Sequence, residues 1–330
     1  MKILCFGVRQ PEKILFESIN KGFNYDLTLV SELLTRDNVE MCRNYDAVLL
    51  RANCIADEQN LLKLKSYGIK YILTRTVGTN HIDIVKAKTL GFRLAYVPNY
   101  SPNAVGELAF SLGNGLLRNL FYIANKTSKN NFSVDNNMFS VEVRNCTIGI
   151  IGTGKIAYTA AVAWKAMGAK IIGYSRTMRE EWKNILTYVD LKTLANTADL
   201  ISIHCPYIKD KNHHMINDEL MKEMKDGVCI VNTSRGEIID HQALLKWMLN
   251  GKIKSVALDV IENETAIFGQ DLTGQKIKDD VIRELINLYP RVIITPHIGS
   301  YTDEAVKNMI EISFNNLKDF IDKKVCANEL

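Results

Sequence analysis

Residues 147–157 read Thr-Ile-Gly-Ile-Ile-Gly-Thr-Gly-Lys-Ile-Ala, an apolar run that ends in a Gly-x-Gly-x-x-Ala turn. A helical pattern follows as far as Met167, and a second apolar run covers 170–174. In such a turn Gly152 permits the tight bend, Gly154 lets the backbone approach a pyrophosphate at the helix N-terminus, and Ala157 allows close helix–strand packing. Because the turn lies between a strand and a helix, this stretch predicts a dinucleotide-binding unit.

Short apolar runs alternate with amphipathic stretches along the rest of the chain, which favours an α/β fold with parallel sheets covered by helices on both faces. At 330 residues, the chain has the length of about two domains. We expect a helix to begin at Ser101-Pro102 and another at the N-cap Thr302. Residues 124–140 are expected to form a surface loop, and 262–280 a long irregular segment. The predicted strands are 2–6, 25–30, 46–50, 70–73, 93–97, 146–151, 170–174, 199–203, 228–232, 255–259 and 291–295.

The composition excludes several classes of protein. Hydrophobic residues make up 47% and charged residues 24% of the chain, so disorder, collagen-like repeats and a small disulfide scaffold are ruled out. A net charge of +4, spread along the chain, does not predict a nucleic-acid or membrane partner. Seven scattered cysteines without a Cys-x-x-Cys pair, and no secretory signal, indicate a cytoplasmic location.

The choice of cofactor depends on the end of the strand at 170–174. An NAD-binding unit carries Asp or Glu at this point to bind the ribose 2′-hydroxyl, but here the strand leads into Ser175-Arg176-Thr177. A carboxylate would repel a 2′-phosphate, whereas a guanidinium binds one through forked, charge-assisted hydrogen bonds. NADP(H) is therefore favoured, and NAD(H) is the alternative.

Chemically active side chains follow three further strands. His297 comes after the run 292–296, where its imidazole is a suitable acid for carbonyl reduction near neutral pH, and His204 has a similar place. Arg235 follows another strand, and Asp259 with Glu262 and Glu264 follows a third. The pair His213-His214 lies in a polar loop without a partner at metal-ligand spacing, so we expect it to be solvated and predict no metal site.

At these residues the chain resembles the D-isomer-specific 2-hydroxyacid dehydrogenases, over nearly its whole length. Residues 79–83, 174–176 and 263–290 are most similar to the D-lactate dehydrogenases of vancomycin-resistance type. The motifs that carry the resemblance are Thr-Arg-Thr-Val-Gly at 74–78, Pro-Asn-Tyr-Ser-Pro-Asn-Ala at 98–104, the turn at 152–157, Val-Asn-Thr-Ser-Arg-Gly at 231–236, Ala-Leu-Asp-Val-Ile-Glu-Asn-Glu at 257–264 and Thr-Pro-His-Ile-Gly at 295–299.

The resemblance implies an architecture of two Rossmann-like doubly wound parallel-sheet domains with an active-site cleft between them. The substrate domain would be residues 1–100 plus 300–330, and the dinucleotide-binding domain 101–299. It also implies a homodimer formed through the cofactor domain.

The resemblance further implies roles for individual residues. Arg235 would bind the substrate carboxylate, His297 would donate the proton, and Glu264 would pair with His297 and favour its protonated form. The predicted substrate-binding residues are Val77, Gly78, Thr79, Tyr100, Asn53 and Tyr301. Those predicted to bind the cofactor are Gly152, Thr153, Gly154, Lys155, Ile156, Ser175, Arg176, Thr177, His204, Cys205, Pro206, Thr233, Ser234 and Asp259.

The implied activity is NAD(P)H-dependent reduction of a small 2-keto acid, pyruvate first, to the D-2-hydroxy acid. A larger or aromatic 2-keto acid, or hydroxypyruvate, is an alternative, because the three catalytic residues act on the carboxylate and carbonyl that these substrates share. An alternative of another class is a dinucleotide-sensing binding protein of the co-repressor kind.

Overall fold

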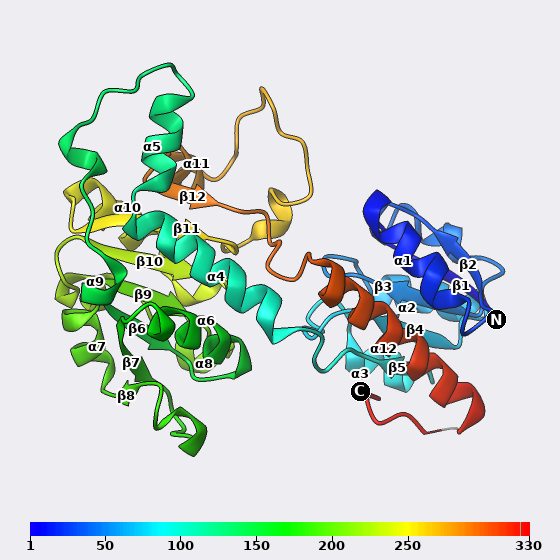
Figure 1. The fold of residues 1–330 in the computed structure, drawn as a ribbon. Coiled ribbons are helices and arrows are strands. Elements are labelled where there is room, and N and C mark those ends of the chain that lie inside the picture. Colours follow the sequence, from blue (N-terminus) through cyan, green and yellow to red (C-terminus); the bar gives the residue numbers. More distant parts are fainter. Residues whose placement is uncertain (324) are drawn as a thin grey trace. The chain divides into compact units, whose positions relative to one another are not determined.

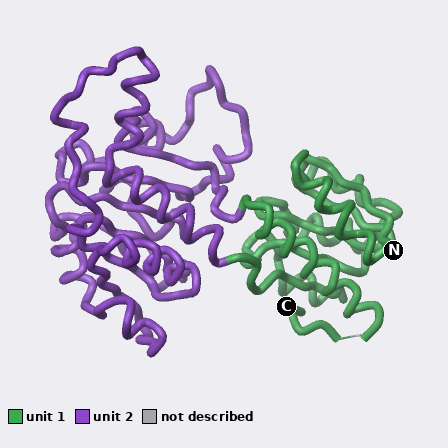
Figure 2. Tube along the Cα trace, in the orientation of Figure 1, with its two compact units in different colours: residues 1–101, 301–330 green, residues 102–300 purple. Residues whose placement is uncertain are grey.

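A computed structural model describes residues 1–323 and 325–330. The chain forms two compact units (Figure 2): unit 1 comprises Met1–Ser101 and Tyr301–Leu330, and unit 2 comprises Pro102–Ser300. None of the helices in these described residues combines the length and the apolar character needed to cross a membrane.

Unit 1 is built on a five-stranded parallel sheet with the order β2-β1-β3-β4-β5. From β1 the chain crosses to β2 at one edge of the sheet, and from β3 it crosses to β4 and then β5 at the other edge. Because these crossovers are right-handed, α1 lies on one face of the sheet and α2 and α3 lie on the opposite face. The C-terminal helix α12 packs beside α1 (Figure 1). At this contact the rings of Phe314 and Phe16 meet edge to face, with their centroids 6.0 Å apart. The strands are β1 Lys2–Cys5, β2 Asp26–Leu29, β3 Ala47–Leu50, β4 Tyr71–Thr74 and β5 Arg93–Ala95; the helices are α1 Gln10–Asn20, α2 Glu58–Ser66, α3 Ile84–Thr89 and α12 Asp303–Asp322.

Unit 2 has a seven-stranded parallel sheet with the order β12-β11-β10-β9-β6-β7-β8. The strands are β6 Thr147–Ile151, β7 Lys170–Tyr174, β8 Thr187–Tyr188, β9 Leu200–Ile203, β10 Val228–Asn232, β11 Ile253–Leu258 and β12 Val292–Ile294. The helices are α4 Pro102–Leu117, α5 Leu120–Thr127, α6 Lys155–Ala166, α7 Leu191–Thr197, α8 Lys209–Asn212, α9 Asp218–Glu223, α10 His241–Asn250 and α11 Asp280–Asn287.

Unit 2 has a hydrophobic core on each face of its sheet. Along β6, Ile148 and Ile150 contribute to the core beneath α4 and α6, while Ile151 belongs to the core beneath α7 and α10. Close packing of α4 on α6 requires glycine, because a Cβ at Gly113 would lie 2.6 Å from Cζ2 of Trp164. The sheet is thus buried on both sides, as nearly continuous apolar strands require.

The predicted fold class of two parallel α/β units is confirmed, and each of the predicted strands is present within a few residues. The helix starts at Pro102 and after Thr302 are also confirmed; the Thr302 hydroxyl accepts from the Ala305 amide at 3.4 Å. The prediction of a loop over 124–140 is wrong at its beginning, where α5 continues to Thr127. Sequence analysis also missed β8, which has only two residues.

Candidate active site

The turn after β6 has the geometry that a pyrophosphate requires. Gly152 has a φ of +92°, and a Cβ there would lie 2.6 Å from the backbone nitrogen of Cys205. A Cβ on Gly154, which caps α6, would instead face open space. The α6 N-terminus is therefore open to a ligand, and its amides favour an anion.

A cavity of about 290 Å³ adjoins this turn. Nine of the residues predicted to bind the cofactor line it: Gly152, Thr153, Gly154, Ser175, Arg176, Thr177, His204, Cys205 and Pro206. Sequence analysis missed Tyr174, Arg179, Ile208, Lys211, Asn212 and Met215, which also line it. The lining contains three cationic side chains and no carboxylate, so its charge suits a phosphorylated ligand.

Two buried polar atoms in the loops after β9 and β10 have no hydrogen-bond partner among the described residues. They are Nδ1 of His204, whose Nε2 meets the Ser202 hydroxyl at 2.8 Å, and Oγ1 of Thr233, which follows β10. Buried polar groups are normally paired, so such atoms are available to a ligand. Together with the glycine turn and the cationic lining, they fit a dinucleotide cofactor.

Tyr188, in the short strand β8, joins two loops next to the cavity, a role that the sequence analysis did not predict. Its hydroxyl donates to Oγ1 of Thr153 at 3.2 Å and accepts from the backbone N–H of Arg179 at 3.2 Å. The short strand β8 therefore links the glycine turn to the loop that carries the cavity arginines.

The other five residues predicted to bind the cofactor lie outside the cavity lining. Lys155 and Ile156 form the first turn of α6, while Thr233 and Ser234 follow β10. The Ser234 hydroxyl donates to the Cys205 carbonyl, which connects the loop after β10 to the cavity wall. The fifth, Asp259, follows β11 and has a different set of partners, described below.

His297 and Glu264 are in direct contact. Nδ1 of His297 lies 2.6 Å from Oε1 of Glu264, and both side chains are partly exposed. Because a carboxylate only accepts hydrogen bonds, Nδ1 carries hydrogen in this pair and Nε2 is left for another partner. The arrangement suits an acid–base histidine oriented by a carboxylate.

Asp259 holds the turn on which His297 lies. Its Oδ1 accepts from the Thr295 hydroxyl at 2.6 Å and from the Ile298 amide at 2.9 Å, and its Oδ2 accepts from the Gly299 amide at 2.9 Å. Burial raises the pKa of the Asp259 carboxyl, and these three hydrogen bonds oppose the rise. Because both oxygens are used inside the protein, Asp259 is a positioning residue for His297, which has a φ of +53°.

The loop after β10 is held just as firmly. The buried Asn232 side chain donates to the Arg235 carbonyl at 2.9 Å and accepts from the Ser234 amide at 3.0 Å. At Gly236 a Cβ would overlap the backbone of Ile261 and Glu262, so this loop touches the one after β11. The Arg235 guanidinium makes one hydrogen bond among the described residues, to the Ser234 carbonyl at 2.7 Å, and keeps its remaining donors for a ligand.

The predicted substrate-binding residues all belong to unit 1. Val77, Gly78 and Thr79 follow β4 in a loop where the Thr76 hydroxyl donates to the Gly78 carbonyl at 2.6 Å. Asn53 has a φ of +71° in the turn after β3, and the Tyr100 carbonyl accepts from Asn308 at 2.8 Å. The Tyr301 ring lies 4.0 Å beneath the Arg9 guanidinium.

The sequence of this chain is similar to those of known proteins. Residues 110–299 match the family model described as "D-isomer specific 2-hydroxyacid dehydrogenase, NAD binding domain". The chain belongs to this family. It is 38% identical to an aromatic 2-oxoacid reductase of Clostridium sporogenes over 330 residues, covering 100% of this chain and 99% of the relative.

Two further relatives extend the similarity. A D-lactate dehydrogenase of Lactiplantibacillus plantarum is 38% identical over 324 residues, covering 98% of this chain and 97% of the relative. The apo-structure of the Escherichia coli D-lactate dehydrogenase has a TM-score of 0.90 at 33% identity and covers 100% of both chains. The predicted family is thus confirmed, whereas the similarity to the vancomycin-resistance type stays a prediction.

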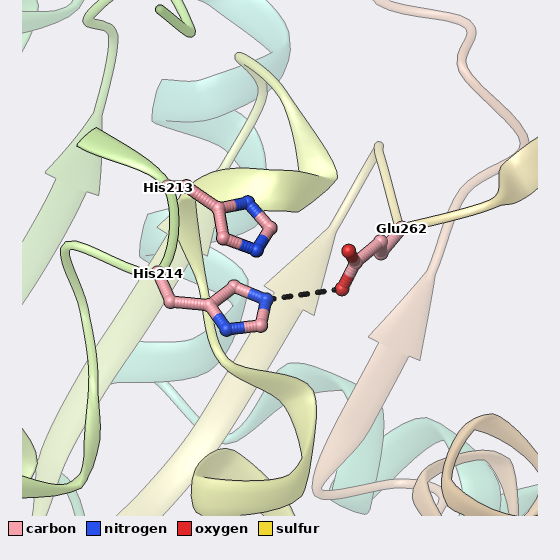
Figure 3. A group of neighbouring side chains, drawn as sticks. All are labelled: His213, His214 and Glu262. Carbon is pink, nitrogen blue, oxygen red and sulfur yellow. Dashed lines mark hydrogen bonds and ion pairs between the residues drawn. The ribbon is translucent and has the colours of Figure 1, made fainter. Parts of the chain in front are cut away.

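One group of side chains in the described part of this dehydrogenase brings together possible metal ligands. Figure 3 shows His213 and His214 facing Glu262, with Nε2 of His214 3.1 Å from the Glu262 carboxylate. The expectation that both histidines are solvated is therefore wrong for His214. The two imidazoles stack at 3.9 Å and 20°, however, so their in-plane lone pairs do not converge on one ion. We interpret the group as a polar link between the loops after α8 and β11.

Buried histidines give this dehydrogenase a pH-dependent stability. Burial lowers the pKa of both His204 and His241 to about 4. Within residues 1–323 and 325–330, neither ring nitrogen of His241 has a hydrogen-bond partner. Both rings are neutral in the folded and unfolded chain above pH 6.5. Below it the unfolded chain takes up protons that the folded chain does not, so the stability that each neutral ring contributes is lost as the pH falls from 6.5 towards 4.

We predict that His241→Phe makes the free energy of unfolding less dependent on pH between 6.5 and 4. The change removes one proton uptake, worth at most about 1.4 kcal/mol per pH unit. Urea unfolding at pH 7, 6 and 5 measures the slope, with His213→Gln at an exposed histidine as the control. The same slope in His241→Phe and the unaltered protein would contradict the prediction.

Proposed function

We propose that this dehydrogenase catalyses the reversible NAD(P)H-dependent reduction of a small 2-keto acid to the D-2-hydroxy acid, with pyruvate as the first substrate to test. The contact between His297 and Glu264, at the carboxyl edge of the sheet whose β6 carries the glycine turn, is the observation that supports it most directly. Family membership fixes the reaction class. Relatives named for lactate and for aromatic 2-oxoacids leave the substrate side chain open.

In the proposed reaction Arg235 pairs with the substrate carboxylate and polarises the keto oxygen. His297 gives its Nε2 proton to that oxygen while C2 gains a hydride, and Glu264 stabilises the charged imidazole beforehand. The cofactor, when bound, supplies the hydride from its nicotinamide. The amides of Val77, Gly78 and Thr79 are proposed to bind the carboxylate, with Asn53, Tyr100 and Tyr301 around the substrate.

In this proposal unit 1 is the substrate domain and unit 2 the cofactor domain. Lys155, Ile156, Thr233 and Ser234 support the cofactor alongside the residues of the cavity. NADP(H) is preferred, because Arg176 lies in a lining without a carboxylate to repel a 2′-phosphate. The seven cysteines are all unbonded, which supports a location in the reducing cytoplasm.

A homodimer formed through unit 2 is also proposed. Three apolar side chains after α5 are strongly exposed, namely Phe132 at 73%, Val134 at 87% and Phe139 at 87%. The segment is anchored where the Tyr122 hydroxyl donates to Asp135 at 2.9 Å and Asn119 donates to the Phe139 carbonyl at 3.0 Å. An ordered segment with exposed aromatic rings suits an interface with a second copy.

We predict that Arg235→Ala lowers kcat/KM for 2-keto acids by about 100- to 1000-fold, since the substrate loses its fixed cation. The assay follows reduced-cofactor absorbance with pyruvate, phenylpyruvate and hydroxypyruvate, each with NADPH and with NADH. Arg144→Ala, at an exposed arginine of the same unit, is the control. Tight NADPH binding without turnover of any acid would favour the dinucleotide-sensing alternative.

Arg176→Ala is expected to raise the KM for NADPH by about tenfold or more, because one charge-assisted contact to the 2′-phosphate is lost. NADH has no such phosphate, so it serves as the internal control and its KM should change little. Equal losses for the two cofactors would remove the argument for NADP(H).

The proposed dimer predicts a mass in solution of twice the 37.3 kDa of one chain. Changing both Phe132 and Phe139 to Asp should shift the protein toward the monomer, measured by light scattering after gel filtration. Val85→Asp, at an apolar side chain in unit 1 that is 78% exposed, is the matched control. A monomer in the unaltered protein would exclude this interface.

A further inference from the structure

Three arginines of unit 1 follow three adjacent strands of its sheet. Arg51 and Arg75 come directly after β3 and β4, and Arg9 lies just beyond β1. Since these strands are parallel neighbours, their carboxyl ends lie at one edge of the sheet. The order in which strands are added to the sheet reverses between β1 and β3, because β2 lies on one side of this pair and β4 on the other. Ligands of open α/β sheets bind at such a switch point.

The buried carboxylate of Glu12 lies among these arginines and forms an ion pair with Arg75. Glu12 is 3% exposed, and its Oε2 accepts from Nη2 of Arg75 at 2.9 Å and from the backbone N–H of Arg9 at 3.0 Å. Nη2 of Arg75 also donates to the Gly7 carbonyl at 2.7 Å. Arg75 is thus paired with a carboxylate inside the protein, whereas Arg9 and Arg51 form no ion pair among the described residues.

Among the described residues, neither the Arg9 nor the Arg51 guanidinium forms an ion pair, although the Glu12 carboxylate is close enough to attract Arg51. Arg9 lies over the Tyr301 ring, which attracts a cation but carries no charge. Among the described residues, the Arg51 side chain makes no hydrogen bond or ion pair, although it is partly buried. Its methylenes pack on Gly7, where a Cβ would lie 3.1 Å from Arg51 Cδ.

The surplus of positive charge is unfavourable without a ligand. Burial, together with the neighbouring Arg9 and Arg75, lowers the pKa of Arg51 to about 10, and the attraction of the Glu12 carboxylate only partly opposes this shift. A partly buried guanidinium is normally paired with an anion, because removing its water is costly. An anion at this edge would relieve the repulsion and form bidentate hydrogen bonds with a planar guanidinium.

We propose that Arg51, assisted by Arg9, binds a second carboxylate of the substrate, so that the preferred substrates are short 2-oxo diacids such as oxaloacetate and 2-oxoglutarate. The inference rests on the proposed function and narrows it, since pyruvate lacks this group. The amides proposed to bind the first carboxylate follow β4, the neighbour of β3. Neighbouring strands are about 4.8 Å apart, a spacing comparable with that between the two carboxylates of a short diacid.

The test compares kcat/KM for oxaloacetate, 2-oxoglutarate, pyruvate and phenylpyruvate in the unaltered protein, Arg51→Gln and Arg51→Lys. We expect the unaltered protein to prefer a diacid over pyruvate. Arg51→Gln should lower kcat/KM for the diacid by about 10- to 100-fold, mainly through KM, as expected for a lost charged hydrogen bond. Pyruvate should change less than about threefold, and Arg51→Lys should recover part of the diacid activity.

The matched control is Arg43→Gln, at an exposed arginine of unit 1 that pairs with Glu40 at 3.5 Å. This variant should leave kcat/KM for each of the four acids unchanged. Preference for a monoacid in the unaltered protein, or equal losses for all four acids in Arg51→Gln, would overturn the inference but not the proposed function. Failure to reduce any of the acids would overturn both.

A calorimetric titration with succinate and with inorganic phosphate separates a substrate subsite from a site for a free anion. Weak succinate binding that Arg51→Gln abolishes supports the subsite. Phosphate binding lost in Arg51→Gln, with unchanged diacid kinetics, would identify a free-anion site and reject the substrate assignment. Thermal unfolding of each variant shows whether the fold is intact before these results are compared.

Discussion

The candidate active site depends on one buried carboxylate, that of Asp259. Asp259 directly follows β11, and its carboxylate accepts hydrogen bonds from one hydroxyl and two backbone amides of the turn after β12. A carboxylate buried without such partners would cost several kcal/mol, so the ion and the turn stabilise each other. This turn carries His297, whose Nδ1 lies 2.6 Å from Oε1 of Glu264. An acid–base pair on two loops thereby gains the rigidity of the sheet beneath it.

Close approach of backbone to backbone is the second constraint on the site. Gly152 meets Cys205, and Gly236 meets Ile261 and Glu262, at distances that leave no room for a side chain. The first contact joins the loops after β6 and β9, and the second joins those after β10 and β11. Four loops from different parts of the chain thus form one continuous edge, along which the glycine turn and the proposed catalytic residues are arranged.

The charged side chains at the carboxyl edge of each sheet favour anionic ligands. In unit 2 the cavity beside the glycine turn has arginine and lysine in its lining and no carboxylate. In unit 1 the buried Glu12 pairs directly with Arg75, while Arg9 and Arg51 form no ion pair among the described residues. Both units place cations where parallel strands end. The same topology underlies the phosphate site proposed in one unit and the carboxylate site proposed in the other.

The sequence alone predicted the strands and the glycine turn, because apolar periodicity and strand-end residues are local signals. The same signals selected His297 and Arg235 as candidate site residues, and the family resemblance added the pairing of Glu264 with His297. It missed β8, which is too short to show alternation, and α5, whose Asn- and Lys-rich end has the composition of a loop. Only the tertiary structure showed that Asp259 holds the His297 turn and that Glu262 reaches His214. It also showed that Arg51 is partly buried and forms no ion pair with another described residue. Each of these depends on contacts between residues far apart in the chain, and no local pattern encodes such a contact.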